Sequence, residues 1–92
     1  MFEKSLLITF HTEYSFDKSS LEQYLRAFSQ WGMVTENTWI IKTILSPKYI
    51  HDHIVTFLPS NSRLFVVKVQ KNAAWSNIMC PSDWINDNLS LL

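Results

Sequence analysis

Histidines are the residues of this chain that come closest to suggesting chemistry. His11 closes an apolar run that begins at Leu6, and its ring could donate a proton or bind a soft metal ion. The alternative, which we favour, is that His11 ends a strand and makes an ordinary hydrogen bond. His51 and His53 flank Asp52, but residues two apart on a helix face different directions, so we do not expect the two rings to form one site.

Other signatures of catalysis or cofactor binding do not occur in the sequence. Cys80 is the only cysteine, so a small buried residue is its expected role. One glycine cannot build a phosphate-binding loop, and no GxSxG motif is present. The four tryptophans could stack on nucleic-acid bases, but such sites also use a basic groove. Eight basic residues balance eight acidic ones, so nucleic-acid binding is not favoured and packing is the expected role of the tryptophans.

Length and composition predict one small domain. The 92 residues are enough for a single domain, residues 1–92, and 47% of them are apolar, as in globular chains. The lone cysteine suits a reducing compartment. The apolar run from Leu6 to Phe10 is too short to span a membrane, so we expect a soluble, cytoplasmic protein that does not bind membranes.

The apolar pattern alternates between strand and helix periods along the chain. Trp39, Ile40 and Ile41 form a buried central strand that leads to a helix capped by Ser46 and begun by Pro47. Strands are expected at 5–11, 33–37 and 63–70, helices at 19–31 and 47–57, and an appendage at 71–92 with an edge strand at 73–75 and a short helix from 81 or 82.

The first helix has a possible signal at each end. Ser19 and Glu22 have the spacing of a capping box, and Ser15 is a competing cap. Gly32, the only glycine, follows Trp31 and is expected to cap the helix C-terminus in the left-handed conformation.

This order of elements predicts an α+β fold of the ferredoxin-like βαββαβ plan. In that plan two helices cover one face of an antiparallel sheet. Because the central strands look apolar on both faces, we expect the second face to pack on a second copy of the chain with two-fold symmetry. Edge-to-edge pairing is the competing geometry of the homodimer. The candidate interface residues are Leu7, Thr9, His11, Trp39 and Ile41.

A family resemblance extends over nearly the whole chain. The first strand, the helix ending in Trp31-Gly32, the segment 37–43, the Leu45-Ser46 helix entry and Ala73-Ala74-Trp75 resemble the small CRISPR-associated adaptation nuclease superfamily. The most similar branch is that of its stand-alone SinR-like and VapD-like members. The resemblance implies a ferredoxin-like fold, a homodimer, and a superfamily that includes metal-dependent ribonucleases, deoxyribonucleases and toxins of toxin–antitoxin pairs.

The sequence departs from that superfamily at the position of its metal ligand. An Asp usually closes the first strand there, whereas this chain has His11 followed by Thr12. Mg²⁺ prefers oxygen ligands to imidazole, so the departure argues against the usual site. A nuclease would have to re-form its catalytic site from His11, Glu13 and Asp17, with Mg²⁺ or Mn²⁺ as the cofactor.

The function expected from the sequence is a non-catalytic, dimeric protein-interaction module that needs no cofactor. It would act as a bacterial or phage accessory factor and bind an unidentified protein. The first alternative is a metal-dependent nuclease of RNA or DNA with an atypical site. The second is a nucleic-acid binder that does not cleave.

Overall fold

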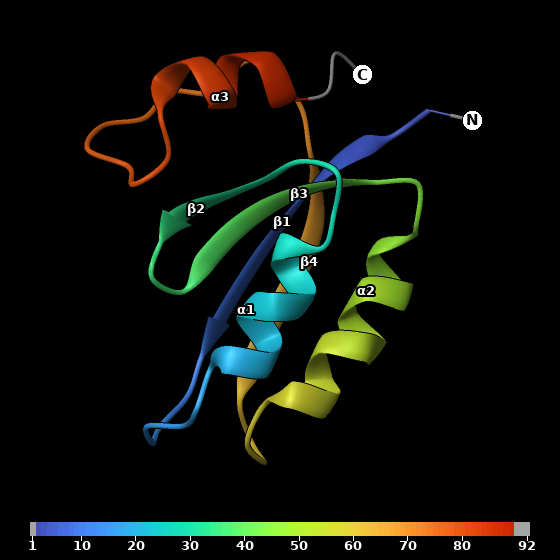
Figure 1. Cartoon of the computed structure of the whole chain (residues 1–92), viewed down its shortest axis with the longest axis vertical. Coiled ribbons are helices and arrows are strands. Elements are labelled where there is room, and N and C mark those ends of the chain that lie inside the picture. The colour runs from blue at the N-terminus through green and yellow to red at the C-terminus, as the bar shows by residue number, and fades with distance from the viewer. Residues whose placement is uncertain (1, 90–92) are drawn as a thin grey trace.

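The structure, a computed structural model, describes residues 2–89. Met1 and the last three residues of the predicted appendage lie outside this range. Strands, helices and one 3₁₀ turn alternate along the chain (Figure 1). Their bounds are β1 Lys4–His11, α1 Ser19–Arg26, β2 Trp31–Thr35, β3 Thr38–Thr43, α2 Pro47–Ile54, η1 Val55–Phe57, β4 Arg63–Val69 and α3 Ser82–Asn88.

The four strands form one antiparallel sheet in the order β2-β3-β1-β4. β1 lies inside the sheet and places Leu7 opposite Ile40 of β3 and opposite Val67 of β4. β3 is also an inner strand, which agrees with its continuous apolar run. The prediction of an α+β fold with an antiparallel sheet is therefore confirmed.

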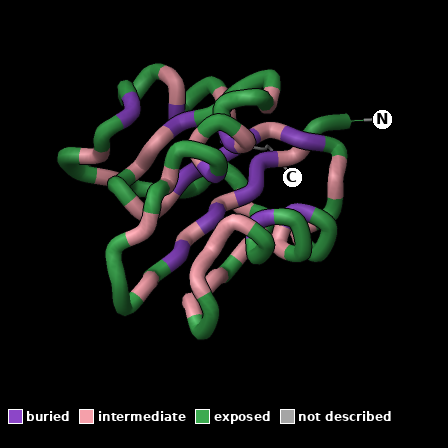
Figure 2. The backbone as a smooth tube through the Cα atoms, turned by 60° about the horizontal axis from the view of Figure 1, so that its bottom comes forward, coloured by how far each residue is buried: buried purple, intermediate pink, exposed green. Residues whose placement is uncertain are grey.

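The main core lies between the sheet and helices α1 and α2. Buried residues run along the central strands, while exposed residues fill the loops and turns (Figure 2). The members of this core are Leu6, Ile8 and Phe10 of β1, Trp39 and Ile41 of β3, Leu21 and Leu25 of α1, and Ile50 and Ile54 of α2. Both helices use a stripe of apolar residues at helical spacing for this contact.

The second face of the sheet is partly covered by the C-terminal part of the same chain. A second cluster joins α3 and the loop before it to this face. Its members are Ile40, Cys80, Ile85 and Leu89, with Leu7, Val34, Val69, Trp75, Ile78 and Trp84 packed against them. The Ser5 hydroxyl also donates a hydrogen bond to the Asn88 carbonyl. The premise that a second copy must cover this whole face is therefore wrong, because the appendage already shields much of its apolar surface.

The two helices that cover the main core begin in different ways. The Ser46 hydroxyl accepts a hydrogen bond from the Tyr49 N–H at 3.1 Å, and Pro47 occupies the first turn, as the sequence predicts. The prediction of a capping box for the first helix is wrong. Ser19 lies inside α1 and makes no side-chain cap, and the carboxylate of Asp17 instead accepts from the Ser19 N–H at 2.9 Å.

Gly32 lies in β2 and does not cap a helix. α1 ends at Arg26, and Gly32 has no positive φ. Its role is steric: a Cβ at this position would lie only 2.6 Å from Cζ3 of Trp84. The bare Cα therefore lets the Trp84 ring of α3 pack directly on the sheet.

The predicted edge strand at 73–75 is also wrong. No regular structure is assigned to these residues, and the loop that contains them has left-handed residues at Asn72 and Asn77 on either side, with φ of 81° and 57°. Asparagine tolerates this conformation, which turns the chain away from an extended path.

Candidate functional site

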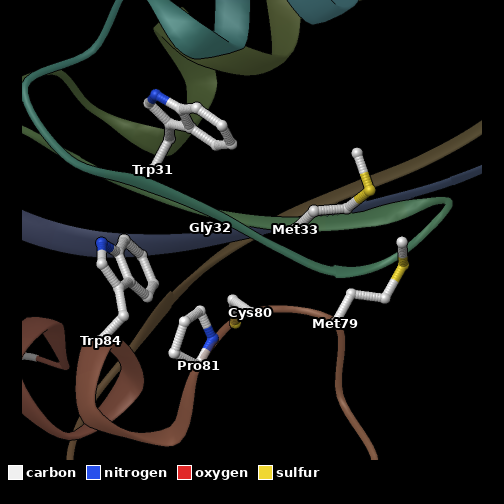
Figure 3. A pocket seen from close by; sticks show the side chains of 7 residues that line it. All are labelled: Trp31, Gly32, Met33, Met79, Cys80, Pro81 and Trp84. Atoms are coloured by element: carbon white, nitrogen blue, oxygen red, sulfur yellow. The ribbon is translucent and has the colours of Figure 1, made fainter.

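An apolar groove runs along the free edge of β2. Its volume is about 330 Å³, within the range of ligand pockets. Trp31 and Met33 of β2 form one wall, and Met79, Pro81 and Trp84 form the other, with the β2 backbone between them (Figure 3). Residues from two distant parts of the sequence thus meet at this edge.

Backbone groups of β2 face this groove. The Lys42 N–H of β3 donates to the Gln30 carbonyl at 3.0 Å, so Gln30 faces the sheet. Neighbouring residues of a strand direct their backbone groups to opposite sides, so those of Trp31 and Met33 face away from β3. The Val34 carbonyl is occupied, because it accepts from the Met79 N–H at 3.0 Å. The stretch from Trp31 to Met33 is therefore the part of the edge that can pair with another strand.

The two tryptophans of the groove are held by contacts behind them. The Trp84 indole N–H donates to the Gln30 side-chain carbonyl at 3.2 Å. The Trp31 ring lies against Trp39, with ring centroids 5.5 Å apart, and the Arg26 guanidinium lies 5.7 Å from the Trp31 ring. Fixed aromatic rings lose little conformational entropy when a ligand binds, which suits them to recognition.

Cys80 contributes an apolar surface to the groove. The residue is buried, and burial raises the pKa of its thiol. At neutral pH the sulfur therefore remains protonated, and the reactive thiolate is disfavoured. We assign Cys80 to packing, as the sequence predicts for a lone cysteine.

The residues of the predicted nuclease site have separate partners. His11 is exposed at the end of β1, opposite Arg63. The Glu13 carboxylate lies 4.0 Å from the Arg63 guanidinium. Asp17 accepts from the Ser19 hydroxyl at 2.6 Å, in addition to the Ser19 N–H. Within residues 2–89, no group of three or more His, Cys, Asp or Glu side chains is placed to hold a metal ion.

The predicted interface residues fall on two faces of the sheet. Thr9 is opposite Thr38, so Trp39 and Ile41 point to the other side, where they are fully buried beneath the helices. These two residues therefore cannot form part of an exposed interface. On the second face, Leu7 packs against the cluster beneath α3, and the Thr9 and Thr38 hydroxyls are hydrogen-bonded at 3.0 Å.

The histidines of α2 have different surroundings. The His51 Nδ1 lies 2.9 Å from an Asp52 carboxylate oxygen, and Lys48 donates to the other oxygen of Asp52 at 2.7 Å. The His53 ring instead stacks on Tyr24, with ring centroids 4.3 Å apart. One histidine belongs to an exposed charged cluster and the other to the contact between the helices.

The Asp17 carboxylate should stabilise the start of α1 in a pH-dependent way. Its hydrogen bonds from the Ser19 hydroxyl and N–H lower its pKa below the ordinary value of 3.8. Its contribution is therefore present above the unfolded-state pKa and is lost as the pH falls through the lower folded-state pKa. We expect Asp17→Ala to lower the free energy of unfolding at neutral pH and to have little effect in strong acid.

Urea denaturation at neutral pH and in strong acid measures the change in the free energy of unfolding. Glu13→Ala is the control for removal of an exposed carboxylate. Titration with Mg²⁺ and Mn²⁺ adds a second test. If either ion stabilises the wild type but not Asp17→Ala, Asp17 is a metal ligand and the capping role is insufficient.

Comparisons with protein-family models, curated proteins and solved structures found no match. The resemblance to the CRISPR-associated superfamily therefore stays a prediction. No helix among the residues that the structure describes combines the length and the apolar character needed to cross a membrane.

Sequence reasoning did not find the groove at the β2 edge. Its walls come from residues 31–33 and 79–84, and no local pattern links these two segments. The available signal was weak: tryptophan and methionine occur in both segments, and each type is also common in ordinary cores.

Proposed function

We propose that the protein is a non-catalytic interaction module that binds an extended apolar segment of another protein along the edge of β2. The observation that carries this proposal is the groove, in which outward-facing backbone groups of Trp31 and Met33 lie between apolar walls. A peptide that adds a strand gains hydrogen bonds from the backbone and specificity from its alternating side chains.

The walls indicate which side chains such a peptide would carry. Alternate residues of an added strand point to opposite faces of the sheet. One set would contact Trp31 and Met33, and the other would contact Met79, Pro81 and Trp84. Tryptophan is common at binding hot spots, and methionine adapts to varied apolar shapes. A segment with apolar residues on both of its faces fits the groove best.

We also propose that the fold belongs to the ferredoxin-like class. One helix follows β1 and a second follows β3, and the strand order is β2-β3-β1-β4 with antiparallel neighbours. This order supports the split βαβ plan, to which α3 is an addition on the second face of the sheet. The addition matters for function because α3 and the loop before it supply one wall of the groove.

Selection of short random peptides displayed on phage, with the full chain immobilised, tests the proposed function. We expect the selected peptides to contain runs of apolar residues and to bind the wild type in isothermal titration. Met79→Glu should weaken this binding at least about tenfold, because it places a charge in an apolar wall. Ile44→Glu is the matched control, since the exposed fractions of Met79 and Ile44 are 55% and 49%.

Hydrogen exchange distinguishes strand addition from other modes of binding. The amide protons of Trp31 and Met33 should exchange more slowly when the peptide is bound, because strand addition supplies acceptors for them. If a selected peptide leaves both amides unchanged, or binds Met79→Glu as well as it binds the wild type, the proposed function is wrong.

A further inference from the structure

The outer edge of β4 has a second set of backbone groups without a neighbouring strand. β4 lies at the end of the sheet order, and β1 is its neighbour within the described chain. The Phe10 N–H donates to the Asn37 carbonyl beside β3, so Phe10 and alternate residues of β1 face β3. The backbone groups of the β1 residues between them face β4. The β4 residues opposite Phe10, Ile8 and Leu6 are Leu64, Val66 and Lys68, so the backbone groups of these three point outward.

We propose that two copies of the chain pair edge to edge through β4, with a two-fold axis at Val66. In an antiparallel pair centred there, Val66 lies opposite the partner's Val66, and Leu64 lies opposite the partner's Lys68. All three outward-facing residues of each copy then form hydrogen-bonded pairs. A register centred on Leu64 or Lys68 leaves outward groups of the same strand unpaired, and centring on Lys68 also places like charges opposite each other.

The side chains of β4 also fit this register. Phe65 lies opposite the partner's Val67 on the second face of the sheet, and aromatic and β-branched residues form favourable cross-strand pairs. Phe65 is 60% exposed in the single chain, beyond the area that α3 covers. Pairing would shield its ring. The exposed edge has no proline, and its seven residues are paired with β1 in an unbroken register.

The helix side of β4 carries the outward-facing residues at this edge. Leu64, Val66 and Lys68 share this side, because alternate residues of a strand point to the same face. Leu64 and Val66 also line a groove of about 380 Å³ between α2 and β4. Asp52 of this groove is already paired with Lys48 and His51, so the pairing of the two copies depends on the backbone groups of β4 and on Phe65 rather than on charge.

The other edge of the sheet does not offer an equivalent self-pairing surface. β2 has a register shift between Met33 and Thr35, and Met79 already binds the Val34 carbonyl. Edge-to-edge pairing through β4 therefore leaves the groove of β2 free in both copies. This inference is independent of the proposed function, and each can fail without the other.

Sedimentation velocity on the full chain at micromolar concentration tests the proposal. We expect the wild type to sediment as a dimer. Phe65→Lys should raise the dimer dissociation constant at least about tenfold, because it replaces an apolar cross-strand partner by a charge. Tyr49→Lys is the matched control. Tyr49 is 56% exposed and shares a surface hollow with His53, which stacks on Tyr24 of α1, and it does not line the groove between α2 and β4.

A backbone variant makes the test specific to strand pairing. Val66→Pro removes an outward N–H while the β1 hydrogen bonds of Phe65 and Val67 remain, and edge strands tolerate proline at such positions. Circular dichroism establishes that the variants are folded. A folded, monomeric Val66→Pro supports the proposal, as do slowly exchanging amide protons at Leu64, Val66 and Lys68 in the wild type. A wild type that stays monomeric, or a dimer with freely exchanging amides at these three residues, overturns it.

Discussion

Trp39→Ala is expected to lower the free energy of unfolding by about 3–5 kcal/mol, the range measured for large aromatic residues in protein cores. Trp39 is fully buried at the centre of the sheet and is the largest of the fully buried side chains. Its ring packs beside Trp31, and the Arg26 guanidinium lies 5.8 Å away. Small domains have a free energy of unfolding of only about 5–15 kcal/mol, so the substitution would remove a large fraction of it.

Urea denaturation followed by circular dichroism measures this effect without relying on tryptophan fluorescence. Trp75→Ala is the control, since Trp75 is only partly buried and its indole N–H donates to the Ser82 hydroxyl at 3.1 Å. Its replacement should cost clearly less. Trp39→Phe keeps an aromatic ring in the core and should recover part of the lost stability. Equal losses for Trp39→Ala and Trp75→Ala would show that the helix-covered core is not the main source of stability.

The elements with strong local signals could be predicted from the sequence. Ser46 and Pro47 marked the start of α2, and the apolar run around Ile40 marked an inner strand. These signals are local because a helix cap and a strand face involve residues close together in the chain. The antiparallel α+β architecture followed from the order of such elements.

The partner of each apolar surface could not be predicted in the same way. α3 has seven residues and buries Ile85, too little pattern to indicate which surface it covers. The second face of the sheet was therefore assigned to another copy, although Ile85 and Leu89 pack beside Ile40. Gly32 was ambiguous for a similar reason, because a glycine after a helical stripe fits a helix cap as well as a close contact with a distant ring.

The sequence identified His11, Glu13 and Asp17 by residue type, but residue type does not determine which groups lie together. Arg63, which is distant in the sequence, lies beside Glu13, and Ser19 binds Asp17. The groove at the β2 edge shows the converse. Trp31 and Trp84 had no chemical signature in the sequence, and the fold places both in one surface.

Gly32→Ala is expected to lower the free energy of unfolding by about 1–3 kcal/mol through overpacking. The added Cβ would lie 2.6 Å from Cζ3 and 2.8 Å from Cε3 of Trp84, so the ring must move. Moving it weakens the hydrogen bond between the Trp84 indole and Gln30 and loosens α3 on the sheet. The backbone is not the cause, since Gly32 has no positive φ and alanine can adopt its conformation.

A double-mutant cycle with Trp84→Ala isolates the contact. Once the ring is absent, the alanine at position 32 has room, so Gly32→Ala should cost little in the Trp84→Ala background. The rate at which Cys80 reacts with a thiol reagent gives a second measurement. Cys80 is buried and burial raises its pKa, so it should react slowly in the wild type and faster in Gly32→Ala.

Additive effects in the cycle, with no change in the reaction of Cys80, would mean that α3 does not depend on the contact between Gly32 and Trp84. Coupled effects would show that Gly32 influences binding through Trp84. The Trp84 ring packs against the backbone of Gly32 and also lines the groove. A loosened α3 would then weaken peptide binding at β2, while Leu64, Val66 and Lys68 of β4, which are not members of the cluster beneath α3, kept their ability to pair.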